Sequence, residues 1–318
     1  MPTGARQMRE SFHVAYCFDK GYRQHFGAAV SSLLSNSKEV GVELIIHVVT
    51  DSLDPQLAMQ LDEISNFYGV EIKKYQLSHD ISEQINSLPP SPLLGYLSRA
   101  AYYRLWLADL LPAEVEKVLY LDSDTIVQKN LSELFAMPFD GSSILGVQDA
   151  NHITWERMHG LKQYINSGVL LLNLDVWREK KLLDRCLQWV KEHPDRNFLA
   201  DQCVINAALT DEIKLIPSQW NHYVEPAKPF DGNHTNYIIH YITKDKPWQA
   251  WYDPAQAKAY WYYLSNSPWR GAKAEQATTV EQLYRQADFS RKDGRLEEAL
   301  ELFDKIINLQ AKSLSKDT

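Results

Sequence analysis

The sequence predicts an α/β fold in which helices flank a mainly parallel sheet and a helical hairpin follows at the C-terminal end. Short apolar runs suited to strands alternate with longer segments of helical spacing, and the first of them follow one another as strand, helix, strand, helix. Residues 280–309 have helical spacing throughout, which predicts the hairpin. At 318 residues the chain has room for one large domain or two small ones.

The expected elements follow from local patterns along the chain. Apolar runs predict strands, helical spacing predicts helices, and polar stretches with proline predict loops. Asp54, which precedes Pro55, and Asp175 both have the chemistry of a helix N-cap. In chain order we expect a strand over 12–18, a loop over 19–22, a helix over 22–34, a strand over 42–49, a helix over 55–67, a strand over 70–75, a loop over 80–92, a helix over 97–111, strands over 118–121 and 168–174, helices over 175–191 and 201–209, a strand over 213–216, and an irregular aromatic stretch over 217–246 with a strand-like part at 237–240.

The composition places limits on the class of protein. The net charge of −8 argues against a nucleic-acid binder, which usually has a basic surface. Three widely spaced cysteines form neither a metal-binding pattern nor a disulfide framework, so we expect buried thiols in a cytosolic protein. The start of the chain lacks the apolar core of a signal peptide, and no apolar run reaches the length of a membrane span. We therefore expect a cytoplasmic protein, and peripheral contact with the inner face of a membrane stays open.

The segment 278–311 follows a main domain expected over 12–270. Its small and apolar residues stand close to the positions of a tetratricopeptide repeat: Leu283, Ala287, Gly294, Leu296, Ala299, Phe303 and Ile306. One such repeat cannot bury a solenoid core by itself. We therefore expect a hairpin packed on the main domain, with a surface for a protein partner or for self-association as the functional alternative.

The stretch 118–124 ends an apolar run in two carboxylates. Four apolar residues predict a strand buried on both faces, and Asp122 and Asp124 follow it. Side chains at i and i+2 of a strand point the same way, so the two carboxylates are expected to converge at the edge where open α/β sheets bind ligands. Hard oxygen ligands suit Mg²⁺ or Mn²⁺. The alternative for an Asp-x-Asp triplet is an ordinary turn or cap.

Four further motifs stand where other elements begin or end. They are Asn166-Ser167-Gly168 before an apolar strand, Asp201-Gln202 at a helix start, His240-Tyr241 at a strand end and Lys246-Pro247-Trp248 in a short loop. With the aspartate triplet, this ordered set over about residues 12–270 resembles glycosyltransferase family 8. The resemblance implies the GT-A fold, with a Rossmann-like, mixed and mainly parallel sheet. The family uses sugar nucleotides, retains the anomeric configuration, and includes bacterial lipopolysaccharide galactosyl- and glucosyltransferases as well as glycogenin.

The resemblance also implies a role for each matching residue. The metal ligands would be Asp122, Asp124 and His240, and an imidazole among oxygen ligands favours Mn²⁺ over Mg²⁺. Gln202 would face the anomeric carbon, with Asp201 as the alternative, a covalent nucleophile. The donor would be bound by Asp19 and Tyr22 at the uracil, by Arg104, Asp122 and Ser123 at the sugar, ribose and phosphate, by Asn166 and Asp201 at the sugar hydroxyls, and by Thr243 and Lys246 at the diphosphate.

Two positions depart from the family's usual residues, and each role has a plainer alternative. Gly21 stands where an asparagine is frequent, and Thr243 stands where the loop usually has glycine, so a positive φ there would be costly. Taken singly, Arg104 is also consistent with a surface charge, and Lys246 with a loop cation. His240 would suit a core histidine, and Asn166 a residue that satisfies the loop backbone.

The resulting hypothesis is a metal-dependent retaining transferase that moves galactose or glucose from a UDP-hexose to a hydroxyl of a glycan or lipid-linked glycan, in the synthesis of lipopolysaccharide or another surface polysaccharide. Self-glucosylation on a tyrosine is a weaker option within the same family. The alternative from another class is a catalytically silent nucleotide-sugar-binding protein that acts through its helical hairpin. A metal-dependent hydrolase of nucleotide sugars is the third hypothesis.

Overall fold

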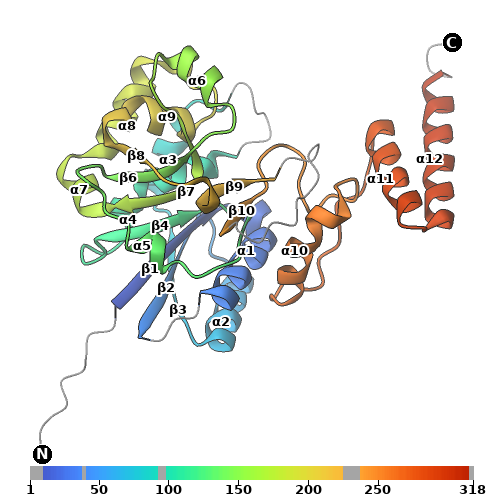
Figure 1. Cartoon of the computed structure of the whole chain (residues 1–318), viewed down its shortest axis with the longest axis horizontal. Helices are drawn as coiled ribbons and strands as arrows, with labels where there is room; N and C mark the ends of the chain where they lie inside the picture. The colour runs from blue at the N-terminus through green and yellow to red at the C-terminus, as the bar shows by residue number, and fades with distance from the viewer. Residues whose placement is uncertain (1–9, 38–40, 92–97, 225–236, 315–318) are drawn as a thin grey trace, which may run out of the picture.

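The computed structural model describes residues 10–37, 41–91, 98–224 and 237–314. Within these ranges the main sheet has seven strands in the order β3-β2-β1-β4-β7-β6-β8 (Figure 1). The pairs β3–β2, β2–β1, β1–β4 and β6–β8 are parallel, whereas β7 runs antiparallel to both β4 and β6. The strands are β1 Glu10–Phe18, β2 Val42–Thr50, β3 Glu71–Gln76, β4 Lys117–Leu121, β6 Ile144–Gln148, β7 Ile165–Asn173 and β8 Ile213–Leu215.

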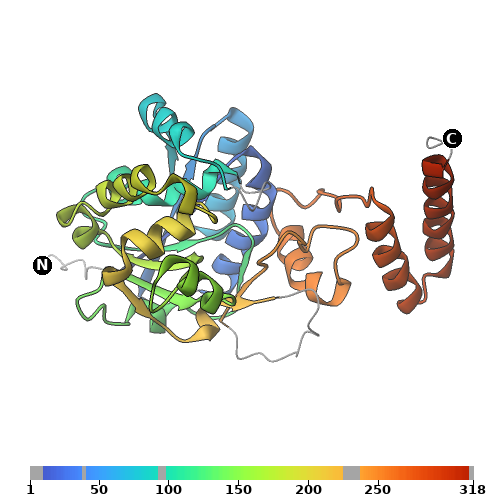
Figure 2. The same cartoon turned by 90° about the horizontal axis from the view of Figure 1, so that it is seen from above.

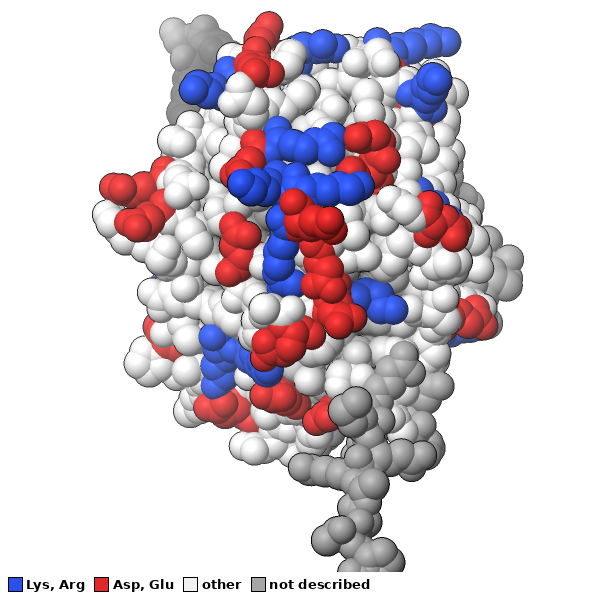
Figure 3. Space-filling view, turned by 90° about the vertical axis from the view of Figure 1, so that its left-hand side faces the viewer, with Lys and Arg blue, Asp and Glu red and all other residues white. Residues whose placement is uncertain are grey.

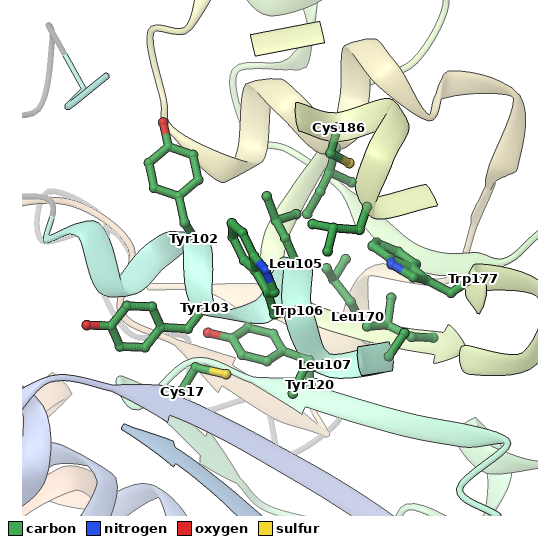
Figure 4. Close-up of a cluster of buried hydrophobic side chains, with 14 of the residues drawn as sticks. Cys17, Tyr102, Tyr103, Leu105, Trp106, Leu107, Tyr120, Leu170, Trp177 and Cys186 are labelled. Atoms are coloured by element: carbon green, nitrogen blue, oxygen red, sulfur yellow. The ribbon is translucent and has the colours of Figure 1, made fainter. Parts of the chain in front are cut away.

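Both faces of this sheet are buried, because the side chains of each strand alternate between two apolar clusters. On β4, Val118 and Tyr120 enter one cluster, whereas Leu119 and Leu121 enter the other. The first cluster packs under the segment η2 Arg99–Trp106 and contains its large aromatic residues (Figure 4). The second lies under α1 Arg23–Asn36 and α2 Pro55–Tyr68.

A smaller sheet lies beside the main one and contains β5 Thr125–Val127, β10 Ile238–His240 and β9 His222–Tyr223, in that order. Strand β10 runs antiparallel to β5, with His240 opposite Thr125. Because β5 starts directly after the aspartate triplet, this pairing brings the end of β10 next to that triplet.

The other described helices cover the sheets and extend the chain. Those before residue 200 are η1 Lys20–Tyr22, α3 His79–Ser87, α4 Leu107–Leu110, α5 Ser132–Phe135, α6 His152–His159, α7 Leu174–Glu179, α8 Leu182–Glu192 and η3 Pro194–Arg196. Those after it are α9 Asp201–Ala208, η4 Thr210–Glu212, η5 Ser218–Asn221, α10 Pro254–Ser265, α11 Val280–Lys292 and α12 Leu296–Leu314. The α/β architecture with a mainly parallel sheet is confirmed.

Three predicted elements were wrong. The loop expected over 80–92 contains helix α3, whose start is capped by Ser78; its polar sequence hid a short helix that buries Ile85, and Pro92 lies outside the described residues. The helix expected over 97–111 is mostly a 3-10 segment followed by the short α4. The helix expected over 175–191 is broken at Lys181, which has φ 50°, and its first part is capped by Asn173 rather than Asp175.

Helices α11 and α12 form the expected hairpin, but they stand apart from the sheets, beyond α10 (Figures 1 and 2), and do not pack on the described part of the main domain as we expected. Between them they bury a small cluster of Leu283, Ala287, Leu302 and Ile306. A Thr279 and Gln282 capping box fixes the start of α11. The hairpin therefore has a small core of its own.

The face of the molecule in Figure 3 carries both positive and negative side chains. On the face in Figure 3, acidic and basic side chains are interleaved over the described residues rather than gathered by sign. Among the described helices, none is both long enough and apolar enough to cross a membrane.

Candidate active site

The carboxyl ends of the central strands and the start of β7 meet at one edge of the sheet. Strand β1 ends before Asp19 and β4 ends before Asp122, while the antiparallel β7 places Asn166 at the same edge. A cavity of about 330 Å³ opens there. It is lined by every residue that the sequence predicts to bind the metal or the donor or to act in catalysis: Asp19, Tyr22, Arg104, Asp122, Ser123, Asp124, Asn166, Asp201, Gln202, His240, Thr243 and Lys246.

Asp122, Asp124 and His240 form a compact group of ligand atoms, which lie within 4.8 Å of one another. We expected the two carboxylates to converge as side chains at i and i+2 of a strand do. The two aspartates lie instead in the turn between β4 and β5. In this turn Thr125 donates a backbone hydrogen bond to the carbonyl of Asp122. The turn still points both carboxylates at His240, whose Nε2 lies 3.2 Å from Asp124 Oδ1 and 3.7 Å from Asp122 Oδ2.

The hydrogen bonds around His240 determine which ring nitrogen faces the carboxylates. Asn166 Oδ1 accepts from the backbone N–H of Gly168, so Asn221 approaches it with its Nδ2 donor. Asn221 Oδ1 is then the acceptor for His240 Nδ1, 2.9 Å away. When the imidazole is neutral, its proton is therefore on Nδ1, and the lone pair of Nε2 then points at two carboxylates, an arrangement that suits a divalent cation.

Gly168 makes room for this group. A Cβ atom at this position would lie 2.2 Å from His240 Cε1 and 2.6 Å from Asp122 Oδ2. A glycine is needed here because of the close approach of β7 to the cluster.

Lys246 reaches into the cluster from the loop after β10. Its Nζ donates to Asp124 Oδ2 and to the carbonyl of Tyr241, both at 2.6 Å. Burial alone would raise the pKa of Asp124, but the Lys246 ammonium holds it well below its ordinary value. Asp124 is therefore an ionised carboxylate at neutral pH.

Arg104 joins the aspartate turn to helix α9. Its NH2 donates to Asp122 Oδ1 at 2.9 Å, and its Nε lies 3.2 Å from Asp201 Oδ2. Tyr120 OH also donates to Asp122 Oδ1, at 2.5 Å, and the guanidinium lies 4.2 Å from the centre of the Tyr120 ring. With 6% of Arg104 exposed, this is a buried network rather than a surface charge.

Asp201 and Gln202 enter the cavity from the first turn of α9, after Ala200, which has φ 50°. Burial raises the pKa of Asp201 to about 6, against the opposing effect of Arg104. The Gln202 amide is fixed at both ends, because its Oε1 accepts from Asn166 Nδ2 at 3.1 Å and its Nε2 donates to Asp149 Oδ2 at 3.2 Å. Neither side chain is free to turn without breaking contacts in the cavity wall.

Asp19 and Tyr22 line the cavity from the loop after β1. Asp19 Oδ1 accepts from the backbone N–H of Gly21 at 2.9 Å, and Ser98 Oγ donates to Asp19 Oδ2. The Tyr22 ring lies edge-on to Trp248, with the ring centres 5.8 Å apart. Both Asp19 and Tyr22 line a second, adjoining cavity as well.

Thr243 has φ 92°, in the region that favours glycine. A positive φ is costly for a β-branched residue, and strain of this kind amounts to about 1–3 kcal/mol. Thr243 Oγ1 donates to the carbonyl of Asp245 at 3.3 Å, which is one contact that holds the loop in place.

Two residues at the site were not found in the sequence. Asp149 lines the cavity after β6, and a weaker form of the signal of Asp122 could have found it: the apolar run of β6 is followed by Gln148 and then by Asp149. Asn221 follows no strand and lies in a 3-10 turn, so its contact with His240 depends on three-dimensional packing alone.

The family follows from comparison with known sequences. Residues 13–252 match the family described as glycosyl transferase family 8, which is most of the chain. The chain therefore belongs to this family of glycosyltransferase enzymes, as its motifs predicted.

Three relatives match over most of their length. The chain is 26% identical over 281 residues to general stress protein A of Bacillus subtilis (strain 168), covering 82% of this chain and 95% of that protein. It is 25% identical over 287 residues to lipopolysaccharide 1,2-glucosyltransferase of Escherichia coli (strain K12), covering 85% and 82%. It is 25% identical over 292 residues to lipopolysaccharide 1,3-galactosyltransferase of Salmonella typhimurium, covering 86% and 84%.

A solved structure shares the fold. The galactosyltransferase LgtC, in complex with donor and acceptor sugar analogues, matches with a TM-score of 0.70 at 20% identity. The match covers 82% of this chain and 99% of that one. The GT-A fold predicted from the motifs is confirmed.

Proposed function

We propose that this chain is a metal-dependent retaining hexosyltransferase that moves galactose or glucose from a UDP-sugar to a hydroxyl of a glycan acceptor. The proposed acceptor is lipopolysaccharide or another surface polysaccharide, free or lipid-linked. The observation that carries the proposal is the group of Asp122, Asp124 and His240 on the wall of a cavity that the other motif residues share. The names of two relatives, which specify glucosyl and galactosyl transfer to lipopolysaccharide, support the hexose and the acceptor class.

The residues at the cluster fit a divalent cation. Two carboxylates and an imidazole converge there, and Gly168 keeps the space between them open. The imidazole ligand favours Mn²⁺, with Mg²⁺ as the second choice. Bound there, the cation would act as a Lewis acid toward the oxygens of the donor diphosphate.

The other residues that line the cavity are proposed to contact the donor. Asp19 and Tyr22 lie at the end proposed for uracil, and Thr243 offers its backbone N–H to the diphosphate. Ser123 Oγ is buried and has no hydrogen-bond partner among the described residues, which leaves it available to the donor. Asn166 and Asp201 line the same cavity, and together they would contact the sugar hydroxyls.

The chemistry proposed for the chain's own groups starts from the bond between the anomeric carbon and UDP. As this bond breaks, negative charge builds on the β-phosphate, and the Lys246 ammonium beside Asp124 is placed to stabilise it. Positive charge builds at the anomeric carbon, which the fixed Gln202 amide oxygen would stabilise during front-face attack by the acceptor. Asp201, a buried carboxylate, is the alternative as a covalent nucleophile.

The test is release of UDP from a panel of UDP-sugars in the presence of Mn²⁺. One UDP-hexose should release UDP slowly by hydrolysis when no acceptor is present, and faster by transfer when an acceptor is added. Asp124→Ala should release no UDP in either case. Asp211→Ala is the matched control, because this exposed aspartate pairs with Arg185 outside the cavity. Turnover that no acceptor accelerates would favour a hydrolase, and no turnover of any UDP-sugar would favour the silent binding protein.

The division into a catalytic domain over 12–270 and a hairpin over 278–311 is part of the proposal. The hairpin carries exposed apolar side chains, among them Leu296, Leu300 and Ile307. We propose that this surface contacts a protein partner or a second copy of the chain. A change of sedimentation coefficient between the full chain and Leu300→Glu would test this role.

A further inference from the structure

The loop Thr243–Lys246 has two properties that conflict. It carries Thr243 and Lys246 into the wall of the cavity, so its conformation shapes the proposed diphosphate site. It is also strained at Thr243, with φ 92°, and both Thr243 and Lys244 are exposed to solvent. A strained, exposed loop keeps its conformation only where the surrounding structure holds it.

The first contact that holds this loop comes from the C-terminal hairpin. Arg285 of α11 donates through NH1 to Asp245 Oδ2 at 3.0 Å. The carbonyl of Asp245 in turn accepts from Thr243 Oγ1. Arg285 therefore restrains the residue to which the strained threonine is bonded, from a helix that begins 28 residues after the family match ends at residue 252.

A second contact comes from the segment between the domain and the hairpin. The Glu275 carboxylate accepts from Gln249 Nε2 at 3.3 Å, and Gln249 Oε1 accepts from the backbone N–H of Lys246 at 2.8 Å. The backbone of Glu275 also pairs with Trp248 and Ala250. This segment fixes the far end of the loop and leads directly to α11, which places Arg285 at Asp245.

We propose that Arg285 is a positioning residue for the donor diphosphate, acting through Asp245 on the loop that presents Thr243 and Lys246. The inference rests on the proposed use of a UDP-sugar. It assigns to the hairpin a part in donor binding that is separate from any contact with a partner protein. Arg285 itself does not line the cavity, so its effect is indirect.

The strength of the effect follows from the exposure of the pair. The side chains of Arg285 and Asp245 are 31% and 20% exposed, so the ion pair is partly screened by solvent. For pairs of this kind the expected change in binding is about two- to fivefold. Arg285→Ala should therefore raise KM for the UDP-hexose and Kd for UDP with Mn²⁺ by about that factor, with little change in kcat.

The matched control is Arg291→Ala, because Arg291 lies on the same helix and pairs with Asp288 of that helix. The control should leave KM, kcat and Kd unchanged. Reversing the pair, with Arg285→Asp and Asp245→Arg together, should restore binding that either single change weakens. If Arg285→Ala does not fold, Asp245→Asn removes the same ion pair from the other side and should give the same increase in KM.

A readout independent of catalysis is cleavage by trypsin after the exposed Lys244. The loop should be cut faster in Arg285→Ala than in Arg291→Ala. Equal cleavage together with equal KM would overturn the inference, as would a loss of kcat at unchanged KM. If the wild type turns over no UDP-hexose and binds no UDP, the proposed function fails, and the cleavage rates alone decide whether Arg285 positions the loop.

Discussion

The substitution Gly168→Ala should displace His240 and Asp122, two of the proposed metal ligands, by a distance that follows from the structure. The added Cβ would lie 2.2 Å from His240 Cε1, whereas carbon atoms in contact settle near 3.5 Å, so about 1.3 Å of movement is required. Metal ligands tolerate changes of only about 0.2 Å. The imidazole and the Asp122 carboxylate, which the Cβ would also meet, therefore cannot both keep their positions.

Two quantities should change in this variant. Affinity for Mn²⁺ should fall at least about tenfold, as when an orienting contact of a metal ligand is lost. The free energy of unfolding should fall by about 1–3 kcal/mol, the usual cost of one added methyl group in a close-packed position. Titration calorimetry with Mn²⁺ and urea unfolding measure these two changes.

Gly271→Ala is the matched control, because a Cβ atom at Gly271 meets nothing within 4 Å and its φ is not positive. It should bind Mn²⁺ as the wild type does. If Gly168→Ala also binds Mn²⁺ with wild-type affinity, then the metal is not held by Asp122 and His240, and the assignment of the cluster is refuted.

Three further predictions concern other residues of the structure. Asn221→Ala frees the His240 ring and should weaken Mn²⁺ binding about 10–100-fold in calorimetry, and an unchanged affinity would show that Asn221 does not orient the ring. Burial raises the pKa of Asp201 from 3.8 to about 6, so between these pH values the folded chain keeps a proton that the unfolded chain releases. As pH rises from about 4 to about 6, the free energy of unfolding of the wild type, measured in urea, should therefore fall relative to that of Asp201→Asn by up to about 3 kcal/mol. Parallel pH profiles of the two proteins would contradict this. Burial also raises the pKa of the Cys186 thiol, so a thiol reagent should leave Cys186 unmodified in the native protein until urea unfolds it, and rapid modification of Cys186 in the native protein would contradict its burial.

Most of the site could be predicted because its residues follow buried strands. Asp19 and Asp122 each end an apolar run, and parallel strands bring such ends to one edge of the sheet. Asn166 was identified from its motif, and its place at the same edge depends on β7 running antiparallel. Local pattern alone indicated Asp122 and Asp124, the resemblance to the family supplied the other residues, and the strand directions brought them together.

What the sequence could not supply are contacts between segments that approach only in the folded chain. Asn221 and Arg285 follow no local pattern: Asn221 contacts His240 and Asn166 at the site, and Arg285 contacts Asp245 in the loop beside it. The helix α3 was missed because one buried residue, Ile85, is too little signal against a polar background. The positive φ of Thr243 likewise results from the loop's neighbours and not from threonine itself.

The most direct test of the central claim is a calorimetric titration of UDP into the protein with and without Mn²⁺. If Asp122, Asp124 and His240 hold a cation that bridges to the diphosphate, Mn²⁺ must tighten UDP binding and UDP must tighten Mn²⁺ binding by the same factor. The account predicts this coupling in the wild type and its loss in Asp124→Ala. UDP binding that is equally tight with and without Mn²⁺, or that survives Asp124→Ala unchanged, would contradict it.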